Sequence, residues 1–201
     1  MAGLRELQRQ RVHEAISAAA IALFLERGFD EVPVTEVAAA AGVSKPTLFK
    51  YFPTKEDLVL HRIADHQGEA ARVVRRRAPG ERPLEALRRH FLDGLSRHDP
   101  VTGLNDEPEV LAYQRMVYST PSLVARLFQH MSLDERALAE ALAETVDDLT
   151  ADLVAGQVLA TQRVLALRNV ELLAEGRPLA EVEREAVRAA ERAFSLLPAG
   201  V

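Results

Sequence analysis

The sequence predicts an all-α protein. Ala, Leu, Glu and Arg, which favour helices, dominate its 201 residues, whereas aromatic residues make up only 5%. Apolar residues recur at intervals of three and four, and no segment alternates apolar and polar residues for long enough to indicate a strand. We therefore expect about nine helices in all, arranged as a three-helix N-terminal domain and a larger C-terminal helical domain.

The composition narrows the class of protein. A hydrophobic content of 48% and a charged content of 27% are ordinary for a chain with a packed core. The absence of cysteine excludes a disulfide framework and any thiolate-bound metal. The longest apolar run, Ala18 to Leu25, is too short to span a membrane, and the N-terminus lacks an apolar signal core. We therefore expect a cytoplasmic protein without a membrane partner.

The charge is unevenly distributed. The net charge is −5, yet residues 1–62 are neutral, with eight Lys and Arg against eight Asp and Glu. All three lysines, Lys45, Lys50 and Lys55, fall within one short stretch. A local cationic surface on an acidic body is typical of a protein that contacts phosphates at one end.

Helix signals place three helices in the N-terminal part, over about residues 7–27, 35–41 and 44–52. Gly28 ends the first helix, and Thr35 is the expected N-cap of the second. Ser44 caps the third helix, and Pro46 lies in its first turn, where a missing N–H does no harm.

A long linker helix is predicted over about residues 54–77, because Thr54 to Asp57 resemble a capping box. Ala78-Pro79-Gly80 ends it. Further helices are expected over about 83–97, 109–119, 121–145, 150–175 and 179–197. Asp147 and Asp148 lie either between two of these helices or inside one continuous helix.

The second and third helices form a helix-turn-helix around Gly42, with Leu48 and Phe52 facing the core. In such motifs the second helix enters the major groove of DNA. Lysine donates to guanine or phosphate, and helix N-termini attract phosphate. A lone lysine is usually a solvated surface charge, but three on one motif favour DNA binding. The candidate DNA contacts are Thr35, Ser44, Lys45, Pro46, Thr47, Phe49, Lys50, Tyr51 and Lys55.

A combination of residues between about Arg11 and Ile63 carries a family resemblance. These residues are Ala19, Ala20, Leu23, Phe24, Gly28, Phe29, Thr35, Ala39, Ala41, Gly42, Val43, Ser44, Thr47, Leu48, Phe49, Tyr51, Phe52, Lys55, Glu56 and Leu58. In this combination the segment, about a quarter of the chain, resembles the DNA-binding domain of the TetR family of repressors. The family usually has tyrosine where this chain has Phe49, so Tyr51 is the expected polar contact to phosphate.

The resemblance implies a ligand-responsive transcriptional regulator, a repressor that binds palindromic double-stranded operator DNA as a homodimer. An unknown, partly apolar small-molecule inducer would release it. The expected domains are residues 1–55 for DNA binding and 56–201 for ligand binding and dimerisation. No cofactor is expected. His61 and His66 lie five residues apart, which does not suit chelation, so no metal is expected either.

Small and apolar residues on the last two helices predict the dimer interface. They are Leu153, Gly156, Ala160, Val164, Val182, Ala186, Ala189, Ala190 and Ala193. The alternative is that these faces pack inside one subunit. Candidate pocket residues are His90, Phe91, Tyr113, Met116, Val117, Phe128, Met131, Gln157 and Thr161. The alternative for each of them is ordinary core packing.

Two other functions stay open at this point. One is an all-helical enzyme, although the sequence shows no Gly-rich phosphate loop, nucleophile elbow or paired metal ligands, so no enzymatic activity is expected. The other is a DNA-binding protein without an inducer, which is either constitutive or controlled by a protein partner.

Overall fold

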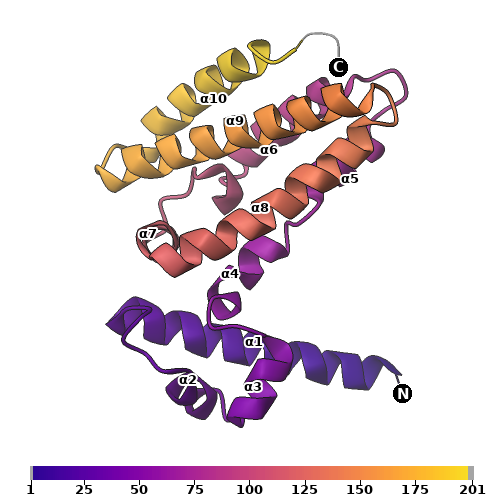
Figure 1. Ribbon diagram of the computed structural model, residues 1–201. Helices are drawn as coiled ribbons and strands as arrows, with labels where there is room; N and C mark the ends of the chain where they lie inside the picture. The colour runs from indigo at the N-terminus through magenta and orange to yellow at the C-terminus, as the bar shows by residue number, and fades with distance from the viewer. Residues whose placement is uncertain (1, 199–201) are drawn as a thin grey trace. The chain divides into compact units, whose positions relative to one another are not determined.

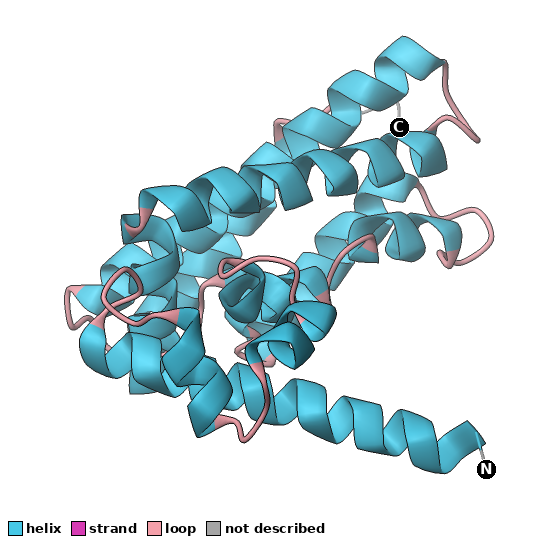
Figure 2. Ribbon diagram, turned by 60° about the horizontal axis from the view of Figure 1, so that its bottom comes forward, coloured by secondary structure: helices cyan, strands magenta, loops and turns pink. Residues whose placement is uncertain are grey.

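The computed structural model describes residues 2–198, apart from the side chains of residues 2, 4, 5 and 64. Within these residues every regular element is a helix, as the sequence predicts (Figures 1 and 2). In chain order they are α1 Ala2–Arg27, α2 Val34–Ala40, α3 Lys45–Tyr51, α4 Asp57–Ala64, α5 Glu69–Arg75, α6 Pro83–Ser96, the 3₁₀ helix η1 Pro100–Thr102, α7 Pro108–Ser119, α8 Pro121–Leu142, α9 Asp148–Ala174 and α10 Leu179–Ser195.

The chain forms two compact units. Unit 1 comprises Met1–Asp65 and Ala112–Leu127, and unit 2 comprises His66–Leu111 and Phe128–Val201. Helices α7 and α8 therefore each contribute residues to both units. The functional boundary predicted near residue 55 stays a prediction, but the N-terminal unit also includes a segment from the C-terminal half of the chain.

The predicted linker helix over 54–77 is wrong, because the chain forms two helices there. A turn over residues 65–68 separates α4 from α5. Gly68 has a φ of +71°, which is outside the right-handed helical region, and its N–H donates to Asp134 Oδ1 at 2.7 Å. The split brings the number of α-helices among the described residues to ten instead of about nine.

The boundary between α8 and α9 is resolved in favour of two helices. Asp147 is the N-cap of α9, and its carboxylate accepts hydrogen bonds from Thr150 N at 3.1 Å and from Thr150 Oγ1 at 2.7 Å. These bonds satisfy a free N–H group of the first turn of α9. The capping bonds lower the pKa of Asp147.

The core of unit 2 lies where α10 packs against α6 and α9. Leu87 and Leu95 of α6, Val158 of α9 and Val182 of α10 are fully buried there. The segment around η1 also packs on α9, where Asn169 Nδ2 donates to Thr102 O at 2.9 Å. A hydrogen bond from this buried amide fixes the segment in one position.

Candidate nucleic-acid interface

The helix-turn-helix consists of α2, α3 and the turn between them. Val43 N donates to Ala38 O at 2.9 Å and Gly42 N to Ala39 O at 3.1 Å, so the turn closes tightly on the end of α2. Gly42 has a φ of +66°, a left-handed conformation that glycine adopts more easily than residues with a side chain. The predicted turn around Gly42 is therefore confirmed.

The caps of the two helices differ. Ser44 is the N-cap of α3, and its hydroxyl accepts from Thr47 N at 3.2 Å and lies 2.8 Å from Thr47 Oγ1. Thr35 is not an N-cap, because α2 begins one residue earlier and its N-cap is Pro33. Thr35 lies exposed in the first turn of α2, at the end of a helix where the dipole favours a phosphate.

One face of α3 is buried and the other is exposed. Leu48 and Phe52 are buried at 0% and 1% exposure, together with Val37 of α2. The opposite face carries the predicted DNA contacts. Lys45, Pro46 and Lys50 are exposed, and Thr47 and Tyr51 are half-buried. Two cations and a short polar side chain thus stand on one solvent-facing surface, which we call the α3 face (Lys45, Pro46, Thr47, Phe49, Lys50 and Tyr51).

Three of the candidate residues have neighbours that the sequence did not indicate. Phe49 is 36% exposed, and Lys45 Nζ lies 5.9 Å from the centre of its ring. Lys55 is more restrained, since its ammonium lies 4.5 Å from the centre of the Phe29 ring and 3.5 Å from Asp30 O. These contacts tie the segment after α3 to the loop after α1.

A cluster of rings holds α1, α3 and α4 together in unit 1. His13 stacks on Phe52 with 4.4 Å between ring centres, and His61 meets His13 edge-on at 5.3 Å. Ser17, which is buried, hydrogen-bonds His61 Nε2 at 2.8 Å. Burial lowers the pKa of His61, and the neighbouring His13 lowers it further. The sequence analysis considered His61 only as a metal ligand, did not consider His13, and missed the cluster.

We expect acid to destabilise unit 1 through His61. Its folded pKa is lower than the unfolded value of about 6.5, so the unfolded chain binds more protons in the interval between the two. Above about pH 6.5 His61 therefore does not reduce the free energy of unfolding of unit 1. That free energy decreases as the pH falls from about 6.5 toward the folded pKa. Thermal unfolding followed from pH 8 to pH 5 should show this decrease. The variant His61→Gln should show a weaker pH dependence, and an identical profile would contradict the assignment.

The candidate pocket residues do not form one group. Tyr113, Met116 and Val117 belong to unit 1. There Met116 and Val117 are buried, and Tyr113 OH donates to Val59 O at 2.8 Å. Burial favours the alternative of core packing for Met116 and Val117, and the pocket assignment of all three residues stays a prediction. Burial also raises the pKa of Tyr113.

The other six candidates belong to unit 2. Phe91 lies in the core beside Phe194. Phe128 is 55% exposed, so more than half of its surface faces solvent in the single chain. His90 Nε2 lies 3.2 Å from Glu69 Oε1. Met131 and Thr161 are half-buried and Gln157 is exposed.

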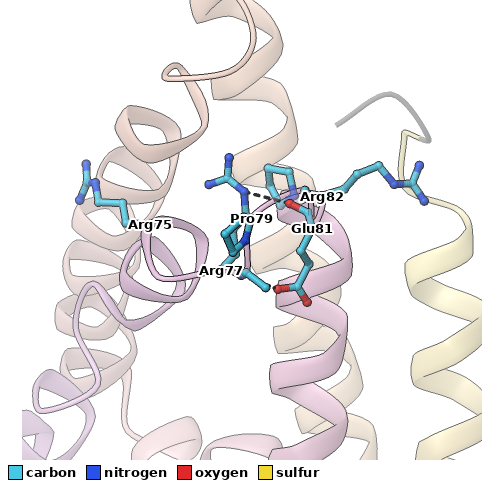
Figure 3. Close-up of a pocket in the computed structure, with 8 residues that line it drawn as sticks. Arg75, Arg77, Pro79, Glu81 and Arg82 are labelled. Carbon is cyan, nitrogen blue, oxygen red and sulfur yellow. Dashed lines mark hydrogen bonds between the residues drawn. The ribbon is translucent and has the colours of Figure 1, made fainter.

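A hollow of about 430 Å³ lies between α5 and α6, lined by Arg75, Arg77, Ala78, Pro79, Gly80, Glu81, Arg82 and Pro83 (Figure 3). Its arginines already have partners. Arg77 donates to Val74 O and Glu81 O, and Arg75 pairs with Glu144 at 3.1 Å. The Arg77 guanidinium therefore stabilises the loop, and the Arg75 guanidinium is engaged by a carboxylate outside it.

The predicted dimer residues differ in their exposure. Leu153, Ala160 and Val164 of α9 are exposed. On α10, Val182, Ala186 and Ala190 are at most 3% exposed, so they pack inside unit 2 and have no surface to offer a partner. Ala189 and Ala193 are half-buried against the same core. Gly156 packs against the Glu135 side chain, because a Cβ at position 156 would lie only 3.0 Å from Glu135 Oε1. Burial therefore favours packing within one subunit for Val182, Ala186 and Ala190, and the dimer interface as a whole stays a prediction.

Comparison with known proteins agrees with this geometry. Residues 16–61 match the model of the bacterial regulatory proteins of the tetR family. The helix-turn-helix domain of this chain belongs to the TetR family. The matched residues of this TetR domain run from the buried part of α1 through α2 and α3 into α4.

Relatives extend the likeness beyond the TetR domain. The HTH-type transcriptional regulator TcmR of Streptomyces glaucescens is 29% identical over 143 residues, which are 70% of this chain and 63% of TcmR. The alignment thus spans less than two thirds of that relative's own length.

Two solved structures share the fold. NalD of Pseudomonas aeruginosa, the secondary repressor of the MexAB-OprM multidrug efflux pump, has a TM-score of 0.64 at 17% identity, with 96% of this chain and 100% of that chain covered. A SmeT–triclosan complex has a TM-score of 0.57 at 16% identity, with 94% of this chain and 93% of that chain covered. Among the described residues, no helix is long and apolar enough to cross a membrane.

Proposed function

We propose that this chain represses transcription as a homodimer that binds an inverted repeat in duplex DNA and is released by a small molecule. The observation that carries the proposal is the α3 face. Lys45 and Lys50 are exposed on it while Leu48 anchors the helix from the other side. A helix held in this way can enter a major groove without disturbing the domain's own core.

The N-cap of α3 adds a reason for base contact at its N-terminal end. Ser44 engages Thr47, which orders the first turn, and Lys45 and Pro46 project from that turn into solvent. Lysine donates to guanine O6 and N7, and an apolar group contacts a thymine methyl. Thr35, Tyr51 and Lys55 would bind phosphates on either side.

Helix α9 supports the homodimer. Its apolar residues surround the whole helix. Val154 and Val158 lie in the core, while Leu149, Leu153 and Val164 are 68%, 56% and 58% exposed. A helix that is apolar on all sides is usually covered on all sides. A second copy of the chain would cover this α9 face, which we define as Leu149, Leu153, Ala160 and Val164.

The inducer would bind in the C-terminal part of the chain, and the triclosan complex of SmeT supports a partly apolar small molecule. Half-buried Met131 and Thr161 and the paired His90 are the remaining candidate contacts. We also propose that the protein acts in the cytoplasm, where its DNA target lies.

Selection of duplexes from a random-sequence pool by the purified chain tests the proposed function. We expect enrichment of inverted repeats whose half-sites lie about one helical turn apart or slightly more. Recovery of sequences without any shared motif would contradict the proposal. A chain with the double substitution Lys45→Ala and Lys50→Ala, selected in parallel, controls for binding by other surfaces.

A further inference from the structure

An ion pair joins two parts of unit 1 that are 69 residues apart in the chain. Arg126 of α8 donates from Nε to Asp57 Oδ1 at 3.0 Å and from Nη2 to Asp57 Oδ2 at 3.3 Å. The Asp57 side chain is only 12% exposed, and that of Arg126 is 34% exposed. A bidentate pair of this kind fixes direction as well as distance, because the guanidinium is planar.

Asp57 has a second role at the start of α4. Its Oδ2 accepts from Thr54 N at 3.1 Å, and Thr54 Oγ1 accepts from Asp57 N at 3.1 Å. The reciprocal capping bonds predicted from the sequence are therefore formed, although α4 itself begins at Asp57. One carboxylate thus holds both the cap and the guanidinium.

The capped segment carries a candidate phosphate contact. Lys55 lies between Thr54 and Asp57, and its ammonium is held over the Phe29 ring. The same segment follows Phe52, which ends α3 and is buried among the rings of His13 and His61. Any displacement of Asp57 would therefore move Lys55 and loosen the C-terminal end of α3.

We propose that Arg126 is a positioning residue for DNA binding, which acts by holding Asp57 and through it the segment that carries Lys55. This inference rests on the proposed function. Tyr113 supports the same assignment, because its hydroxyl binds Val59 O and thus holds α4 from α7 within the same unit. The DNA-binding unit accordingly needs residues 112–127 in addition to its N-terminal helices.

The test compares variants on a duplex that the wild-type chain has enriched from a random pool. We expect Arg126→Gln to weaken binding about tenfold or more. The dependence of affinity on salt should also become shallower, since fewer phosphates are neutralised. A protein that is merely less folded would lose active fraction but keep the wild-type salt dependence.

Three further variants control the experiment. Arg126→Lys keeps the charge and the apolar stem, should fold, and should bind more weakly than wild type but better than Arg126→Gln. Arg115→Gln removes an exposed arginine of the same unit and should leave binding unchanged. The double variant carries Asp57→Asn together with Arg126→Gln. Its DNA affinity should equal that of whichever single variant binds less tightly, because both changes break the same ion pair.

Wild-type affinity in Arg126→Gln, or weaker binding with an unchanged salt dependence, would overturn the assignment. If Arg126→Gln fails to fold, Arg126→Lys decides by the same two readouts. If the wild-type chain enriches no duplex, the proposed function is wrong and this inference falls with it. If the wild type binds and the Arg126 variants bind equally well, only the inference falls.

Discussion

Substitution of Leu153 and Val164 by glutamate is expected to convert the protein into monomers. Both side chains are more than half exposed on the α9 face, so the change leaves the core of unit 2 intact. Glutamates at these positions would be buried without partners in a dimer, which costs several kcal/mol. Light scattering should give a mass near 22.2 kDa, the mass of one chain, instead of twice that value.

Loss of the dimer should also weaken DNA binding by more than about a hundredfold, because each half-site would then be bound independently. The matched control is Arg188→Glu, which places the same acidic group on the exposed, charged face of α10. That variant should remain dimeric and bind DNA. A dimer that survives both glutamates on α9 would refute the proposed interface.

The double substitution Lys45→Ala and Lys50→Ala is expected to abolish most specific DNA binding. Each contact of a lysine with a base edge or phosphate contributes about 1–3 kcal/mol, so affinity should fall by on the order of a hundredfold or more. The slope of log affinity against log salt should decrease by up to about two, one for each phosphate contact that is lost.

Folding should be unaffected, because neither lysine is buried. Arg184→Ala removes an exposed cation from α10 and serves as the control, since it should bind like wild type. Equal affinity of the lysine variant and the control would mean that α3 does not contact DNA.

The sequence predicted the helix-turn-helix well because its signals are local. Ser44 caps α3, Gly42 has the positive φ that the turn requires, and Leu48 is buried at the expected spacing. Each of these features depends on residues only a few positions away. The same is true of the capping bonds between Thr54 and Asp57.

The predictions from sequence are wrong or incomplete where contacts between distant residues determine the structure. Nothing near Gly68 indicates that its N–H will bind Asp134, so the linker was predicted as one helix. The spacing of Val182, Ala186 and Ala190 shows that one face of α10 is buried, but it does not say against which neighbour. The pairing of Asp57 with Arg126 likewise depends on the tertiary fold alone.

The sequence nevertheless contains a signal for the proposed dimer surface. Helix α9 has apolar residues on all sides, so some of them lie on the side that faces away from its own core. Helix α10 has a charged outer face instead, with Arg184, Arg188 and Glu191 exposed. Of these two helices, α9 is the one that exposes large apolar side chains in the single chain.

Site-directed crosslinking from α3 tests the central claim most directly. The chain has no cysteine, so Pro46→Cys provides a single attachment point for a photoactivatable azidophenacyl group on the exposed first turn of α3. Arg192→Cys on α10 provides the matched control. On an enriched duplex, the group at position 46 should crosslink to bases within each half-site, and the group at position 192 should not. Crosslinks from position 192 with none from position 46 would contradict the assignment of α3 as the helix that reads DNA.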